Sequence, residues 1–427
     1  MKRKHSLFLC FVLLLLAFPA SKPNVRAQGT HIFVSPEGAG TDCSQEAPCS
    51  AATGLGKADD GDTLYFEKGT YKGTTDPIFT LTKAVSLIGG WDGSTTIPYT
   101  INPRLYETII DGENVRQLVQ IDTSSPEVMQ VSGITFKNGG AMDSIVIRGG
   151  AIWVKDGGIL IDSCRFENNK ASAYGGAIYV GSDDRFEVKN CQFIGNSVTH
   201  GGGAINITRL GASDVALIED NEFKNNSADY GSAIEIGKSS VTFNANLIAN
   251  NTASSAILVT SPAKVRITNN IIFWDILGNK NYSAIVDYYE AGEITEVINN
   301  TIVNAGRGIT ENYNPKMTLT NNIFYGCYES INVTGEHNLS GTNNLFYGNT
   351  INTFLLDNPI TDQDPLFKNA AMQNYHLKED SPAIDAGAVV ALTDDFDGDE
   401  RPLDGGYDIG ADEFKEGFMI FLPLILR

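Results

Sequence analysis

The sequence has 427 residues and carries 51 acidic against 31 basic side chains, a formal net charge of −20. A surface with this excess of acid repels nucleic-acid phosphates and anionic membranes, so neither is expected as a partner. It would also repel polyuronates such as pectate, unless a divalent cation bridges the two.

Residues 1–27 have the features of a secretory signal. The basic start "MKRKH" precedes the apolar run "SLFLCFVLLLLAF", and Val25 and Ala27 supply the small residues of a cleavage site. A transmembrane anchor is the alternative, but it needs about 20 apolar residues, more than this run provides. We therefore expect cleavage after Ala27, a secreted or cell-surface location, and no membrane span in the mature chain.

Residues 28–60 are expected to form an N-terminal cap. Cys43 and Cys49 enclose the short loop "SQEAP" within this segment. In an oxidising compartment such a pair is expected to form a disulfide, and the alternative is two free thiols.

From residue 61 to residue 360 the chain repeats a short unit. Its copies are spaced 22 to 30 residues apart and include "VSGITF", "IDSCRF", "VKNCQF", "IEDNEF", "ITNNII" and "LTNNIF". A period in this range indicates a solenoid. Alternating Ile, Val and Phe, broken by Asn, Gly and Ser, favour strands, and no leucine framework of leucine-rich repeats recurs. We expect an all-β, right-handed parallel β-helix in which each repeat winds one coil.

Stacked coils place equivalent residues in columns along the axis. One such column is predicted to form a ladder of hydrogen-bonded amides, and it consists of Asn221, Asn246, Asn270, Asn300, Asn322 and Asn344. Cys164 and Cys191 occupy the same column one coil apart. Buried thiols are favoured over a disulfide there, because the side chains of stacked parallel neighbours point the same way.

A second column is expected to face outward. In the strand after each Gly-rich turn, as in "AIWV" and "AIYV", alternation directs the third residue away from the core. This column is Trp153, Tyr179, Asn206, Glu235, Leu258, Val286, Thr310 and Asn332. Its first four members predict a glycan-binding strip, because aromatic rings stack on sugar faces and polar side chains order hydroxyls. The alternative is that the aromatic side chains only cover strand backbone.

Evidence for catalysis is weaker, and the sequence leaves open whether the protein is an enzyme. An eliminating polysaccharide lyase needs a basic side chain near a uronate, often with calcium, and Lys155, Arg209 and Lys238 follow the strip. A hydrolase needs two carboxylates, and Glu235 has no evident partner on a neighbouring coil. His200 is interpreted as a turn residue.

Residues 361–414 contain the densest acidic cluster and are expected to form a C-terminal cap. The alternating Asp395, Asp397 and Asp399, with Gly398 permitting a turn, predict a calcium site. The alternative is a capping network between aspartates and Arg401. The apolar tail, 415–427, ends in "GFMIFLPLILR", which is too short to span a bilayer and is either a docked strand or a signal for surface attachment.

Several segments resemble known families. "FENN" with "GGAI" and "FIGN" with "GGGAI" resemble the repeats of polymorphic outer membrane proteins, and residues 31 to about 349 are similar to the pectate-lyase-like right-handed β-helix superfamily. "DPLFKNAAMQNYHLKEDSPAIDAGA" and "DDFDGDERPLDGGYDIGADEF" resemble the bacterial choice-of-anchor Q region. The N-terminal "HIFVSPEGAGTDCSQEAPCSAATGLGKADDGDTLYFEKGTY" resembles the entry segment of such secreted helices, which implies a strand and a short capping helix before "GDTLYF" as the first coil.

Taken together, the sequence predicts a secreted or cell-surface β-helix, expected to be a monomer, that interacts with an extracellular polysaccharide or surface glycan or mediates adhesion. A polysaccharide lyase and a purely structural surface protein are the alternatives. No cofactor is required by this interpretation, although calcium fits the acidic cluster.

Overall fold

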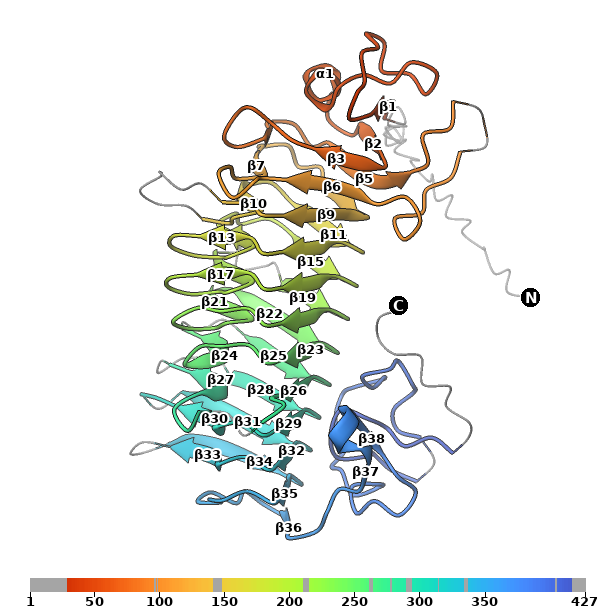
Figure 1. Cartoon of the computed structure of the whole chain (residues 1–427). Coiled ribbons are helices and arrows are strands. Elements are labelled where there is room, and N and C mark those ends of the chain that lie inside the picture. Colours follow the sequence, from red (N-terminus) through yellow and green to blue (C-terminus); the bar gives the residue numbers. More distant parts are fainter. Residues whose placement is uncertain are drawn as a thin grey trace, which may run out of the picture.

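The computed structural model describes residues 29–95, 97, 99–140, 148–209, 215–260, 264–276, 279–288, 294–313, 315–333, 337–403 and 405–416. The predicted signal sequence and all but the first two residues of the predicted apolar tail lie outside these ranges. The described strands stack into three parallel sheets that wind as a right-handed β-helix, confirming the predicted fold (Figure 1). None of the helices within the described residues is long and apolar enough to cross a membrane.

The coils contribute one strand to each of three sheets, here called A, B and C. Sheet A runs in the order β1 (His31–Val34), β2 (Thr63–Glu67), β5 (Ser86–Trp91), β8 (Met129–Ser132), β11 (Ile159–Asp162), β15 (Phe186–Lys189), β19 (Val215–Glu219), β22 (Ser240–Asn244), β25 (Val265–Thr268), β28 (Ile294–Ile298), β31 (Lys316–Thr320) and β34 (Asn338–Thr342).

Sheet B follows sheet A around each coil. It runs in the order β3 (Gly69–Tyr71), β6 (Thr108–Asp111), β9 (Ile134–Lys137), β12 (Arg165–Glu167), β16 (Gln192–Ile194), β20 (Glu222–Lys224), β23 (Leu247–Ala249), β26 (Ile271–Phe273), β29 (Thr301–Val303), β32 (Ile323–Tyr325), β35 (Leu345–Tyr347) and β36 (Ile360–Thr361).

Sheet C closes the coil. It contains β4 (Phe79–Leu81), β7 (Val119–Asp122), β10 (Ile152–Asp156), β14 (Ile178–Val180), β18 (Ile205–Arg209), β21 (Ile234–Lys238), β24 (Ser255–Val259), β27 (Ser283–Asp287), β30 (Arg307–Glu311) and β33 (Glu329–Val333). Two short pairs complete the strands, β13 (Lys170–Ala171) with β17 (Ser197–Val198) and β37 (Phe367–Asn369) with β38 (Asn374–Leu377).

Parallel register carries each repeat position into a column. In sheet B, Phe166 lies opposite Phe136 and Phe193, and these rings stack inside the helix with centroids 5.1 and 4.7 Å apart. The predicted asparagine ladder is present: Asn246 donates from Nδ2 to Asn270 Oδ1 over 3.0 Å, and the same oxygen accepts the Asn246 backbone N–H. The ladder therefore gives hydrogen-bond partners to backbone N–H groups at the buried corners, which do not pair within the sheets.

The remaining repeat residues serve the same structural purpose. Cys164 and Cys191 are free, buried thiols in the ladder column, and the Cys164 backbone N–H donates to Cys191 Sγ over 3.3 Å. A second ladder, which sequence reasoning did not identify, is formed by asparagines three residues after the inward apolar residue of sheet B, which is Phe in three coils and Ile248 in the fourth: Asn169, Asn196, Asn226 and Asn251. The repeated unit is thus scaffold.

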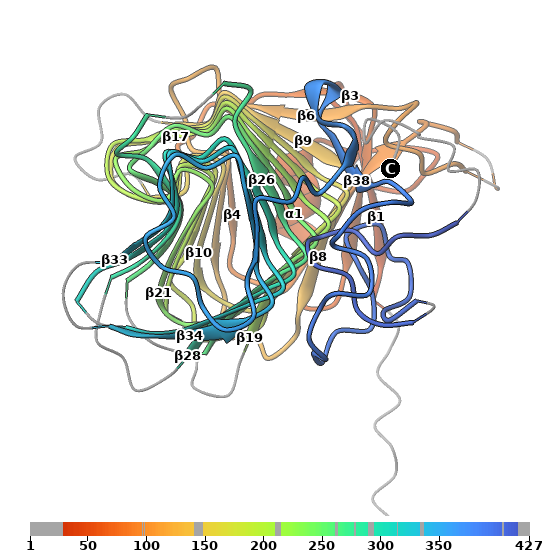
Figure 2. The same ribbon diagram turned by 90° about the horizontal axis from the view of Figure 1, so that it is seen from below.

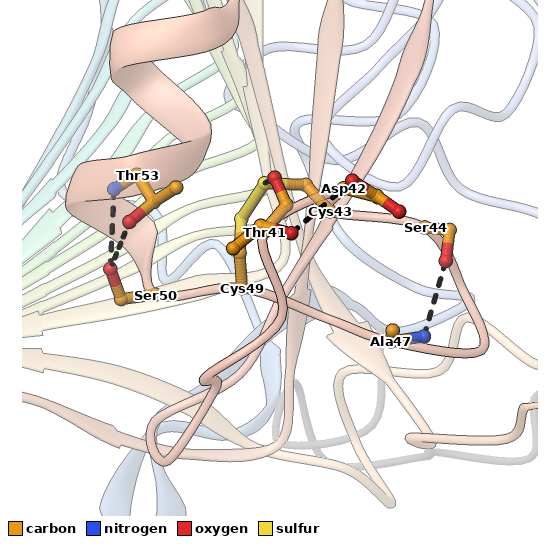
Figure 3. The surroundings of a disulfide bond; sticks show 8 residues. All are labelled: Thr41, Asp42, Cys43, Ser44, Ala47, Cys49, Ser50 and Thr53. Atoms are coloured by element: carbon orange, nitrogen blue, oxygen red, sulfur yellow. Dashed lines mark hydrogen bonds between the residues drawn. A yellow bond between two sulfur atoms is a disulfide. The ribbon is translucent and has the colours of Figure 1, made fainter.

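The N-terminal end is closed by α1 (Ala51–Lys57), whose first turn is capped by Ser50 accepting from the Thr53 backbone N–H. Cys43 and Cys49 form a disulfide beside this cap, with Cα atoms 4.6 Å apart (Figure 3). β1 pairs with β2 in parallel, so the strand of the N-terminal segment is the first strand of sheet A.

The C-terminal region, residues 361–416, does not cover the end of the helix. It lies along the outer side of the lower coils, beside sheet B (Figures 1 and 2). There it forms a second hydrophobic core with outward side chains of sheet B, and its members include Phe273, Val303, Ile323, Phe367, Tyr375, Phe396 and Ile409. The region takes this position because apolar residues on the outside of sheet B need a cover.

Candidate functional site

The outer face of sheet C holds the predicted column. Trp153 lies opposite Tyr179, Tyr179 opposite Asn206, and Asn206 opposite Glu235 in successive parallel pairs. The column continues through Leu258, Val286, Thr310 and Asn332 in the same register. Sequence alternation therefore placed these residues on one line along the axis.

Exposure along this column differs from the prediction. Trp153, Tyr179 and Glu235 are partly exposed, whereas Asn206, Leu258, Val286 and Thr310 are buried. For Asn206 the reason is a turn that folds over the sheet: a Cβ at Gly201 would meet the Glu235 carboxylate at 1.7 Å. Asn206 is fully buried and does not present its amide to the surface.

An aromatic patch lies at the upper end of the column. We define it as Trp153, Tyr174, Tyr179 and His200. The centroid of the Tyr179 ring lies 6.5 Å from those of Trp153 and Tyr174, and His200 lies 5.8 Å from Tyr174. These rings come from three successive coils, which the parallel stack brings side by side.

Two cations stack on this patch. The Arg148 guanidinium carbon lies 5.3 Å from the Tyr179 ring centroid, and Lys155 Nζ lies 4.9 Å from that of Trp153. Lys155 also forms an ion pair with Asp122 over 3.0 Å, and its side chain remains 34% exposed. Such stacking orients each cation over a ring face.

Sequence reasoning missed Arg148, Tyr174 and the position of His200. Arg148, Tyr174, Gly201 and Tyr230 form a parallel line of bridges beside the predicted column. Each lies five residues before a column member, immediately before a Gly-rich turn. The repeat spacing that located Trp153 and Tyr179 was therefore sufficient to locate this second line.

Glu235 is the titratable group with an altered pKa in the column. Burial raises its pKa to about 7, against an opposing effect of the hydrogen bond from Asn206. Asn206 Nδ2 donates to Glu235 Oε2 over 2.7 Å. A carboxyl group that titrates near neutrality can accept or donate a proton at physiological pH.

The other basic candidates are less well placed. Lys238 is exposed at the end of β21 and lies in register with Arg209, whose side chain is outside the described residues. Lys155 is held by Asp122 and Trp153. The described part of the site thus brings Trp153, Tyr179 and Lys155 together and leaves Lys238 at the strand end.

The three aspartates predicted to bind calcium do not converge. Asp395 accepts backbone N–H groups from Asp397, Asp399 and Glu413, and burial raises its pKa to about 6. Asp397 contacts His376, and Asp399 forms an ion pair with Lys415. Because each carboxylate is directed to a different partner, the geometry favours the capping network over the predicted calcium site.

That network includes a buried ion pair. Arg401 Nη1 donates to Glu413 Oε2 over 2.6 Å, and both side chains are fully buried. Arg401 also donates to the carbonyl groups of Asp408 and Gly410. Asp404, another member of the acidic cluster, lies outside the described residues.

Comparisons with known proteins agree with the fold. A family model described as "Right handed beta helix region" matches residues 110–273. A crystal structure of pectate lyase Pel9A is similar over 91% of this chain and 97% of its own, at 15% identity and a TM-score of 0.50. At this identity the similarity establishes the fold alone.

Two further solved structures are similar at lower scores. An alginate lyase complex is 16% identical over 72% of this chain and 80% of its own, with a TM-score of 0.41. A PL6 family polysaccharide lyase from Pseudopedobacter saltans is 14% identical over 77% and 91%, with a TM-score of 0.38. No curated protein matches the sequence.

Proposed function

We propose that the protein is a secreted or cell-surface β-helix that binds an acidic extracellular polysaccharide on the outer face of sheet C. The observation that carries this proposal is the aromatic patch with Arg148 and Lys155 stacked on two of its rings. Partly exposed rings offer apolar faces to sugars, and guanidinium and ammonium groups pair with carboxylates.

The local charge supports an acidic rather than a neutral glycan. The whole chain has a formal net charge of −20, yet Arg148 and Lys155 lie together at the patch, with Lys238 exposed further along the sheet. Lys155 shares its charge with Asp122, so the Arg148 guanidinium is the main group that can attract an anionic sugar to the patch. The ligand class is therefore a uronate-containing chain.

Affinity gel electrophoresis tests this proposal. Gels containing uronate polysaccharides are expected to retard the wild-type protein more strongly than gels containing neutral polysaccharides. The double variant Trp153→Ala/Tyr179→Ala should lose about tenfold or more in affinity, since each aromatic contact contributes roughly 0.5–1.5 kcal/mol beyond its buried area. Arg148→Gln should weaken retention by uronates and leave retention by neutral chains unchanged.

Tyr313→Ala provides the matched control, because Tyr313 is 68% exposed and lies outside the patch. It should migrate as the wild type does. Equal retention of the wild type and the double variant on every gel would remove the patch from the proposed function.

A polysaccharide lyase is the second candidate, and the raised pKa of Glu235 is the observation in its favour. With a pKa of about 7, this carboxyl group could transfer a proton beside a uronate bound at the patch. Incubation with uronate polysaccharides, with calcium or a chelator, would then yield unsaturated ends. The Glu235→Gln variant would form no unsaturated ends but would still be retained on uronate gels. If the wild type forms no such products, binding alone remains the proposed function.

Export and display complete the proposal. They are supported by the signal sequence at residues 1–27 and by the resemblance of residues 361–414 to a choice-of-anchor Q region. The resemblance of the repeats to those of polymorphic outer membrane proteins agrees with a surface protein, and we propose that the chain acts as a monomer.

A further inference from the structure

Three potential metal ligands from separate parts of the C-terminal region meet beside sheet B. His376 belongs to β38, Asp397 to the "DFDGD" turn, and Asp412 to the last described segment (Figure 1). One ligand atom from each lies within 4.8 Å of the other two. This group is distinct from the aromatic patch and does not depend on the proposed function.

The orientation of the His376 ring determines which nitrogen faces the carboxylates. Asn374 Oδ1 lies 3.2 Å from the His376 backbone N and 2.7 Å from its Nδ1. Because the backbone N–H can only donate, the atom that it meets is the amide oxygen, so Nδ1 carries a proton and donates as well. Nε2 therefore points to the two carboxylates.

The carboxylates present oxygen atoms to the same point. Nε2 lies 2.5 Å from Asp397 Oδ2 and 4.0 Å from Asp412 Oδ1. A nitrogen lone pair and two anionic oxygens repel one another unless a cation lies among them. A proton on Nε2 or a metal ion can lie among the three atoms, and the Lys368 ammonium adds positive charge near His376 and Asp412.

Asp412 is the most buried ligand of the group. The residue is 6% exposed, and its Oδ2 accepts the Leu377 backbone N–H over 2.6 Å. Within the described residues its Oδ1 accepts no hydrogen bond and faces His376. A single proton shared between Nε2 and Asp397 does not reach Asp412 Oδ1, which lies 4.0 Å from Nε2, whereas a metal ion can engage all three atoms.

We propose that His376 Nε2 and one carboxylate oxygen each from Asp397 and Asp412 bind a divalent transition metal ion of the zinc class. One imidazole with two carboxylates suits zinc better than calcium, which takes six to eight oxygen ligands. Asn374 holds the imidazole through Nδ1–H, as partners of metal-bound histidines do. The His376 and Asp397 side chains are 11% and 19% exposed, which leaves access for a water molecule as a further ligand.

The proposed ion would join three segments that are distant in sequence. It would link β38 to the "DFDGD" turn and to the segment in which Asp412 directly precedes Glu413 of the buried Arg401–Glu413 pair. Binding to the folded state alone stabilises that state, so metal should raise the unfolding temperature.

Isothermal titration of the full chain with zinc chloride, after dialysis against a chelator, tests the proposal. We expect one equivalent of zinc to bind and the unfolding temperature to rise with zinc concentration. His376→Gln and Asp412→Asn should each lose this binding. Asp399→Asn is the matched control, because Asp399 lies in the same turn, pairs with Lys415 and points away from the site.

Circular dichroism of each variant without metal shows whether it remains folded. The proposal is overturned if the wild type takes up no zinc, in which case the cation is the imidazolium proton. It is also overturned if His376→Gln and Asp412→Asn, folded as the wild type, bind zinc with unchanged affinity, because the metal would then lie elsewhere.

Discussion

At the scale of single residues, an equivalent position in the repeat does not give an equivalent exposure to solvent. Trp153, Asn206 and Glu235 occupy equivalent positions, yet Asn206 is fully buried and holds Glu235. Asn206, which was predicted to contact a ligand, instead donates a hydrogen bond to the Glu235 carboxyl group on the next coil. Turn packing, rather than strand alternation, makes this difference.

Glu235→Gln is expected to change how stability depends on pH. Burial raises the folded-state pKa of Glu235 from 4.5 to about 7, so the folded protein holds its proton more tightly than the unfolded chain. The contribution of this group is fully present below pH about 4.5 and is lost as pH rises toward about 7. The wild type should therefore lose up to about 3 kcal/mol relative to the variant across that window.

Urea unfolding at several pH values measures this difference. Glu37→Gln, which replaces an exposed carboxyl group in the N-terminal segment, serves as the control. A constant difference in unfolding free energy between Glu235→Gln and the wild type from pH 4 to pH 8 would show that Glu235 ionises normally.

At the scale of elements, the corner between sheets A and B turns the chain in every coil and, in the lower coils, also holds the C-terminal region. Its outer residue has a positive φ in each of eight successive coils, from Ser163 at 54° to Asn343 at 54°. In the upper coils this position varies, but in the last four it is always asparagine: Asn269, Asn299, Asn321 and Asn343. Those four side chains donate to backbone carbonyls of the C-terminal region.

Asn299→Ala is expected to loosen the C-terminal region. Asn299 Nδ2 donates to the Asp408 and Gly410 carbonyls over 2.7 and 3.0 Å, and the side chain is buried. Losing these bonds should cost about 1–3 kcal/mol in unfolding free energy. Asn190→Ala is the control, because its φ of 53° is nearly the same and its side chain donates to Asp162 of the preceding coil rather than to a carbonyl of the C-terminal region.

Urea unfolding and limited proteolysis measure the two effects. Protease cleavage within residues 361–416 should become faster in Asn299→Ala than in Asn190→Ala. Equal destabilisation of the two variants would mean that backbone strain, rather than attachment of the C-terminal region, explains the asparagines.

At the scale of the whole molecule, the C-terminal region covers an apolar stripe on sheet B. The covered side chains include Ile271, Phe273, Val303, Ile323 and Leu345. Each fully buried aliphatic or aromatic side chain contributes roughly 1.5–3 kcal/mol. A stripe of this kind left bare would favour contact between molecules.

Removing residues 362–427 is therefore expected to cause self-association. Light scattering should show larger particles for the truncated chain and single molecules for the full chain. Charged substitution of Phe273 and Val303 in the truncated chain should restore single molecules. A truncated chain that stays monomeric without these substitutions would show that the stripe needs no cover.

The sequence by itself determined the β-helix, the asparagine ladder and the line through Trp153, Tyr179 and Glu235. Parallel stacking turns a linear repeat into columns, so spacing alone predicts which residues become neighbours. The tertiary structure decided what lies over and beside those columns: the burial of Asn206, the position of residues 361–416 along sheet B, and the meeting of His376, Asp397 and Asp412. These depend on turns and segments that do not repeat, and their contacts join residues with no common spacing in the chain.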